Sequence, residues 1–218
     1  QHFGVCAYAM AALLGIERRH AVVALAAAFA AAFTAANGLM VAPAAVLLLV
    51  LTRRRREALA WTLAGGALFA VYFIGYETPE GRMSTLDVLR EPIPLVAFGL
   101  ATLGGIGDAN AVAVSIGIAI VLCWLGLAVT GTWRRVPPVA MAAMLFVALT
   151  CAAIALGRAA LGAEAATVSR YRVYSAAAIL LTLAAMLHAT GARSRALGIG
   201  IGAAVALAAA VHVLGGLR

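Results

Sequence analysis

The chain contains no lysine and has few acidic residues. Its 16 basic residues are all arginine, they face 8 aspartates and glutamates, and charged residues make up only 11% of 218 positions. Hydrophobic residues make up 65%. A soluble domain of this length needs far more polar surface. The composition therefore excludes a soluble fold and predicts a protein that crosses a lipid bilayer several times.

Cysteine and histidine are also sparse. Cys6, Cys123 and Cys151 lie in apolar stretches without a CxxC pair, as expected for small buried side chains. His188 and His212 are isolated, so the sequence predicts no metal site and no cofactor. The net charge of +8 comes from arginines at the ends of apolar runs. This placement is typical of membrane proteins, so we expect membrane lipids as partners and no nucleic acid.

Apolar runs occupy nearly the whole chain. A hydrocarbon core about 30 Å thick needs roughly 20 helical residues per crossing, and lipid-exposed segments must satisfy their own backbone groups. We therefore predict an all-α polytopic transmembrane bundle of about seven spans plus one re-entrant or interfacial segment, forming a single domain over residues 1–218. The runs cover residues 3–16, 21–52, 58–76, 93–107, 110–131, 136–156, 175–190 and 197–217.

The run 21–52 is too long for a single crossing. Arg18 and Arg19 precede it and Arg53–Arg56 follow it, and both clusters should be cytoplasmic. A segment that leaves and returns to one side must turn on the other side. We therefore predict two short helices that turn near Asn37-Gly38, at or below the outer surface, with the ranges 21–36 and 39–52.

The same rule orients the rest of the chain. Arg134 and Arg135 are predicted to be cytoplasmic, and the segments 77–92 and 157–174 to be outside. This orientation leaves one crossing between residue 92 and Arg134. We assign it to 110–131 and predict that 93–107 is the re-entrant or interfacial segment.

The most polar stretch of the predicted outer face lies between residues 157 and 175. Its arginines run against the positive-inside bias, and guanidinium groups bind phosphate at two points. One interpretation is a site for an anionic headgroup, such as a lipid-linked phosphate. The alternative is that the arginines extend to ordinary lipid phosphates while the tyrosines anchor the interface. The predicted ligand-binding residues are Arg158, Glu164, Arg170, Tyr171 and Arg172.

Two further polar residues are secondary candidates. Asn37 is either a turn residue or a ligand contact, and Asp108 is either a functional ionisable group within the membrane or part of a wet turn. No nucleophile, base and orienting group occur together in a recognisable pattern. The catalytic residues are therefore unknown from the sequence.

Three stretches together resemble a known group of proteins. They are Thr34–Pro43 around Asn37-Gly38, Val71–Tyr76 with Pro79 after it, and Gly157-Arg158 through Ser169-Arg170-Tyr171. Their order resembles the C-terminal half of uncharacterised bacterial polytopic inner-membrane proteins, which are distantly similar to multi-spanning glycosyltransferases that use polyprenyl-phosphate sugars. The resemblance implies the C-terminal part of a longer chain in the bacterial inner membrane. It also implies that Arg158, Arg170 and Tyr171 belong to an outer-face substrate region.

Three functions remain open at this point. The chain is expected to handle a lipid-linked glycan or sugar phosphate at the outer face, and in the enzymatic version it is a membrane glycosyltransferase. The alternatives are a transporter or flippase, and a non-catalytic structural subunit of a membrane assembly.

Overall fold

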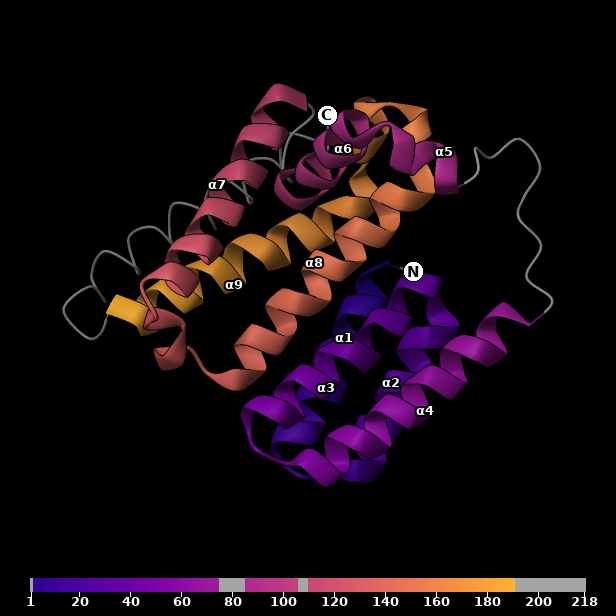
Figure 1. The fold of residues 1–218 in the computed structure, drawn as a ribbon, viewed down its shortest axis with the longest axis vertical. Helices are drawn as coiled ribbons and strands as arrows, with labels where there is room; N and C mark the ends of the chain where they lie inside the picture. The colour runs from indigo at the N-terminus through magenta and orange to yellow at the C-terminus, as the bar shows by residue number, and fades with distance from the viewer. Residues whose placement is uncertain (1, 75–84, 106–109, 191–218) are drawn as a thin grey trace, which may run out of the picture.

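The computed structural model describes residues 2–74, 85–105 and 110–190, and all regular structure in these residues is helical (Figure 1). The all-α prediction is therefore confirmed for this part of the chain. The α-helices are α1 (His2–Glu17), α2 (Ala21–Thr34), α3 (Val41–Leu51), α4 (Arg55–Phe73), α5 (Thr85–Arg90), α6 (Pro92–Gly104), α7 (Asn110–Val129), α8 (Pro138–Arg158) and α9 (Arg172–Thr190). The 3₁₀ helices are η1 (Ala36–Met40), η2 (Thr132–Arg135), η3 (Ala159–Leu161), η4 (Ala163–Ala166) and η5 (Ser169–Tyr171).

Arginines form the tight turns that join α1 to α2 and α3 to α4. Arg19 and Arg53 adopt φ values of 61° and 60°, in the left-handed region that favours glycine. After each of them an amide closes the helix end, with His20 N donating to Gly15 O at 2.8 Å. Arg54 N donates to Leu49 O at the same distance. Both ends are therefore Schellman-type caps with arginine in the position that usually holds glycine.

The chain breaks at Asn37-Gly38, as the sequence predicts. α2 ends at Thr34, η1 contains both residues, and α3 begins at Val41. Gly38 packs directly on the backbone of Ala31, where a Cβ atom would collide with the carbonyl oxygen. This close contact holds η1 against the end of α2.

Helices α6 to α9 are joined by small residues and by hydroxyl groups. Gly104 of α6 and Gly117 of α7 each lie against the backbone of the other helix, a packing mode common in membranes. Ser175 Oγ of α9 donates to the Thr102 carbonyl of α6 at 2.7 Å. Trp124 Nε1 of α7 donates to Thr182 Oγ1 of α9 at 2.8 Å. These contacts fix α9 against two neighbouring helices.

The basic turns that hold Arg54 and Arg135 lie at one end of the bundle, and Arg158 and Arg170 lie at the other end, beside Tyr171. Arg54 donates to the Ile16 carbonyl at the end of α1, whereas His2 at the start of α1 contacts Tyr171. Arg135 donates to the Ala189 carbonyl at the end of α9. Leu51 and Trp133 line one cavity, so both basic turns share an end. The side of the membrane on which this end lies stays a prediction.

The number of spans is a correction to the sequence-based prediction. Within the described residues, three helices are long and apolar enough to cross a membrane, not about seven: Asn110–Val129, Pro138–Leu161 and Arg172–Thr190. The runs 3–16 and 93–107 are themselves shorter than a full crossing, and the break at η1 divides the run 21–52. As a result α1, α2, α6 and the unit Ala36–Leu51 are shorter than about 20 residues, and α4 begins with the charged Arg55, Arg56 and Glu57. The run 197–217 lies outside the described residues, and the role of 93–107 stays a prediction.

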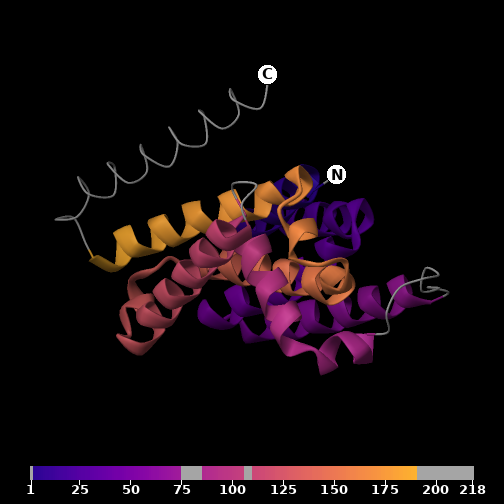
Figure 2. The same cartoon turned by 90° about the horizontal axis from the view of Figure 1, so that it is seen from above.

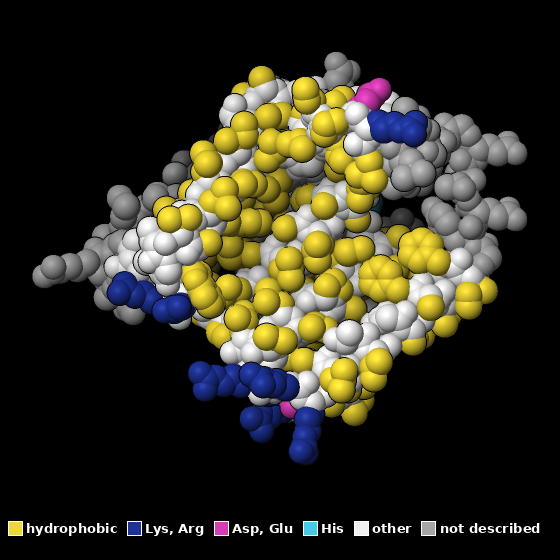
Figure 3. Space-filling model, in the orientation of Figure 1, with side chains coloured by type: hydrophobic (Ala, Val, Ile, Leu, Met, Phe, Trp, Pro, Cys, Tyr) yellow, Lys and Arg dark blue, Asp and Glu magenta, His cyan; other side chains and the backbone are white. Residues whose placement is uncertain are grey.

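The outer surface of the bundle is strongly apolar. Figure 3 shows hydrophobic side chains over the helices, with arginines gathered at the lower and left edges of this face. Val22, Ile93 and Val129 are each more than four-fifths exposed. Apolar surface of this extent is covered by lipid or by another protein. Helices α8 and α9 run through the middle of the molecule in Figure 1, and Figure 2 shows the same helices from above.

Candidate functional site

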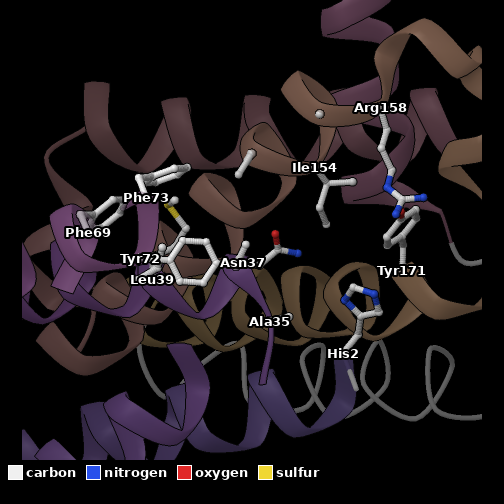
Figure 4. A pocket seen from close by; sticks show the side chains of 14 residues that line it. His2, Ala35, Asn37, Leu39, Phe69, Tyr72, Phe73, Ile154, Arg158 and Tyr171 are labelled. Carbon is white, nitrogen blue, oxygen red and sulfur yellow. The ribbon is translucent and has the colours of Figure 1, made fainter. Parts of the chain in front are cut away.

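A cavity opens at the end of the bundle opposite to the basic turns (Figure 4). Its volume is about 420 Å³, enough for a phosphate-bearing headgroup. The walls come from the start of α1, from η1, from the last turns of α4 and α8, and from η5. The lining includes His2, Ala35, Ala36, Asn37, Leu39, Met40, Phe69, Tyr72, Phe73, Ala153, Ile154, Gly157, Arg158 and Tyr171.

Arg158 and Tyr171 form the cationic side of the cavity. The Arg158 guanidinium carbon lies 5.9 Å from the centre of the Tyr171 ring, within the range of a cation–π contact. Tyr171 is only 2% exposed, so its ring is a fixed platform. Arg158 is half-buried at the end of α8, and its charge faces the cavity (Figure 4). This arrangement holds a guanidinium in position before any anion binds.

Arg170 lies on the same ring from another direction. Its guanidinium carbon is 5.1 Å from the centre of the Tyr171 ring, while its side chain is exposed and outside the cavity lining. Two positive charges therefore share one aromatic ring, which makes this corner attractive to an anion.

Three neutral polar side chains, those of His2, Tyr174 and Asn37, lie together beside the cavity. His2 Nδ1 lies 3.1 Å from the hydroxyl oxygen of Tyr174, which is fully buried. The side chain of Asn37 reaches the same hydroxyl. His2 also meets Tyr171 edge-on, with ring centres 5.4 Å apart. These contacts join η1, α1 and α9 and leave the Asn37 amide pointing into the cavity (Figure 4).

His2 lies outside the three candidate spans, at the first position of α1. Burial lowers the pKa of His2 below its usual 6.5, and neighbouring positive charges, the chain's amino group first and then Arg170 and Arg158, lower it further. The imidazole is therefore neutral near pH 7. In this form it has one donor and one acceptor for a hydroxyl-bearing ligand.

The structure brings together three of the residues that the sequence singled out. Arg158, Tyr171 and Asn37 line one cavity, and Arg170 stacks on its aromatic wall. Arg172 is half-buried at the start of α9 and does not appear in the lining.

Two predicted residues cannot be placed in this way. The backbone of Glu164 lies in η4, but its side chain is outside the described part of the chain. Asp108 lies outside the described residues altogether.

Sequence reasoning missed His2 and the aromatic wall of α4. His2 precedes the first apolar run and has no motif around it, so only the fold reveals its contact with Tyr174, 172 positions away. Phe69 and Phe73 lie four residues apart on one face of α4. That spacing is the available signal, although most apolar helices contain similar pairs.

The described lining can bind an anion and offers no carboxylate for acid–base chemistry. None of its residues in the described part of the chain is Asp or Glu. Likewise, residues 2–74, 85–105 and 110–190 contain no cluster of three or more His, Cys, Asp or Glu that could hold a metal ion. The arrangement favours recognition through charge, aromatic contact and neutral hydrogen bonds.

Comparison with known proteins gives no relative for this chain. It matches no family model, no curated protein and no solved structure. The function must therefore be argued from the cavity itself.

Proposed function

We propose that this chain is part of a multi-pass protein of the bacterial inner membrane that binds a lipid-linked phosphate, such as a polyprenyl-phosphate sugar, at the outer face. The observation that carries the proposal is the half-buried Arg158, held on the buried Tyr171 ring inside a cavity of about 420 Å³. The cavity lies at the end away from the basic turns. The positive-inside rule assigns those turns to the cytoplasm, so the proposal places the cavity at the outer face.

The lining matches the two parts of such a ligand. Arg158 and the nearby Arg170 complement the phosphate, which guanidinium groups bind through charged hydrogen bonds. Asn37 and neutral His2 offer donors and acceptors for sugar hydroxyls, and Tyr72 supplies an aromatic surface beside them. The resemblance to polyprenyl-phosphate-sugar glycosyltransferases favours the same class of ligand. Glycosyl transfer by this chain would need an acid or base from outside the described lining.

Binding of undecaprenyl phosphate to the purified protein in detergent tests the proposal. We expect Arg158→Gln to weaken binding about tenfold or more, because a charged hydrogen bond contributes on the order of 1.5–3 kcal/mol. Arg158→Lys should recover only part of this loss, since lysine lacks the two-point fork. Undecaprenol, which lacks the phosphate, should bind weakly to all variants.

Arg56→Gln is the matched control, because Arg56 is exposed at the opposite end of the bundle. It should leave the affinity unchanged. Equal losses in Arg158→Gln and Arg56→Gln would reduce the effect to non-specific charge and contradict the proposal. Labelling of a cysteine at position 54 from the periplasm would contradict the orientation.

A further inference from the structure

A second, apolar groove lies along α3 and α4, next to the cavity. Its volume is about 270 Å³, and small or apolar side chains of α3 and α4 form its walls. It lies beside the closest contact of these helices, where a Cβ atom on Gly65 would come within 2.7 Å of the Ala42 Cβ. The lining consists of Ala42, Pro43, Val46, Trp61, Thr62, Gly65, Gly66 and Phe69.

The groove adjoins the cavity that contains Arg158. Phe69 lines both, and Met40 of the cavity lies three residues before Pro43 of the groove. Thr62, Gly66, Phe69 and Phe73 follow one another on one face of α4. From Phe73 to Thr62 this face extends about 16 Å along the helix axis. A cavity with a charged side therefore lies next to an apolar groove.

Gly66 lines this groove without adding a side chain to it. A Cβ atom built at Gly66 meets no atom within 4 Å. The glycine costs helix stability relative to alanine, and no close helix contact requires it. The space above Gly66 is large enough to admit an apolar group from outside the protein.

We infer that the α3–α4 groove at Gly66 holds the hydrocarbon chain of the same amphiphile whose phosphate lies at Arg158. This inference rests on the proposed function, because the charge at Arg158 is what selects an anionic lipid over any other apolar molecule. The ligand then enters sideways from the bilayer, with its head between α4 and α8 and its chain along α4. Lipid surrounding the helix has no such anchor and exchanges freely.

A polyprenyl phosphate that carries a photoreactive diazirine within its chain tests the inference. The full chain is reconstituted in phosphatidylcholine nanodiscs with this probe at low mole fraction, and cross-linked residues are mapped by mass spectrometry. Cross-links should concentrate between residues 42 and 69. Gly66→Leu should reduce them about tenfold, since a leucine displaces many van der Waals contacts at once. Gly66→Ala should give a smaller loss.

Gly126→Leu is the matched control, because Gly126 is exposed on α7 and a Cβ there also meets no atom within 4 Å. It should leave cross-linking in the groove unchanged. Cross-links spread evenly over α4 and α7, or an unchanged yield in Gly66→Leu, would overturn the inference. If Arg158→Gln still weakens phosphate binding in that case, the proposed function stands alone. If Arg158→Gln has no effect on phosphate binding, both the proposed function and the hydrocarbon-chain site in the groove are contradicted.

Discussion

The helices before residue 52 and those after residue 110 reach across the bundle in different ways. α1, α2 and α3 contain 16, 14 and 11 residues. α7, α8 and α9 contain 20, 21 and 19. In the second group each helix covers the distance alone, whereas in the first group α2 and α3 stop early and η1 closes the gap. The first group therefore contains a break, at η1, where the second group has continuous helix.

The cavity forms where these two groups meet. α2 ends at Thr34, and η1 places Asn37 in the same cavity as Arg158 at the end of α8. The short helices supply the floor and the long helices supply the charged rim. A site of this kind needs both groups of helices. Substitutions in the short helices and substitutions in the long helices should therefore have different effects.

The largest effect is expected where the short helices are packed most tightly. Gly38→Ala would place a methyl group on the Ala31 carbonyl oxygen, and overpacking of this kind costs about 3 kcal/mol. The thermal midpoint of the purified protein should fall accordingly. Gly126→Ala, in open space on α7, should instead leave stability unchanged or raise it by up to about 1 kcal/mol. Similar results for both would show that the close approach of Gly38 to Ala31 does not contribute to stability.

A smaller effect is expected in the long helices. Thr182→Val removes the acceptor of the Trp124 indole and should cost about 1 kcal/mol, the typical size of a hydrogen bond between helices in a membrane. Thr62→Val is the control, because that hydroxyl bonds only to the Ala58 carbonyl of its own helix. Chemical denaturation of both variants in detergent measures the difference. Equal losses would mean that the α7–α9 bond adds nothing.

A substitution in the arginine turns of the short helices should increase the stability of the protein. Arg53→Gly relieves a left-handed conformation at φ 60° and should raise the free energy of unfolding by about 1 kcal/mol. Arg53→Ala removes the same charge but keeps the conformational cost, so it separates the two effects. A gain of the same size in both variants would assign it to charge.

The smallest effect concerns pH and the residue that joins both groups. Because the pKa of His2 is lowered, the imidazole gains its proton only below about pH 6.5. A third positive charge should then strengthen binding of a polyprenyl phosphodiester sugar, whose single charge stays constant, by a factor of about three, because unit charges about 6 Å apart in water (dielectric constant about 80) attract by about 0.7 kcal/mol. His2→Gln should remove this rise. A rise that persists in His2→Gln would assign the titration to another group.

Several features of this fold are readable from the sequence. Asn37-Gly38 predicts the break between α2 and α3, because a glycine there allows the close approach to Ala31. The arginine clusters predict which helix ends lie together. The span number was wrong because short apolar runs were counted as crossings, whereas α1, α2, α6 and Ala36–Leu51 form helices too short to span an average bilayer.

The site is only half readable in this way. Arg158 and Tyr171 stand out because they are polar residues close together in the sequence. Their meeting with His2 and Asn37 depends on packing between segments more than 100 positions apart, and no local pattern encodes that. The apolar wall of α4 gives only a weak signal, the four-residue spacing of Phe69 and Phe73, since phenylalanine is equally common on lipid-facing helices.

The 14-residue α2 has a consequence for the membrane around it. Its axial length is about 21 Å, roughly 9 Å less than an average hydrocarbon core. A bilayer that covers α2 from end to end is therefore thinner than average beside it. We expect water and headgroups to come closer to the midplane at this flank than beside α7.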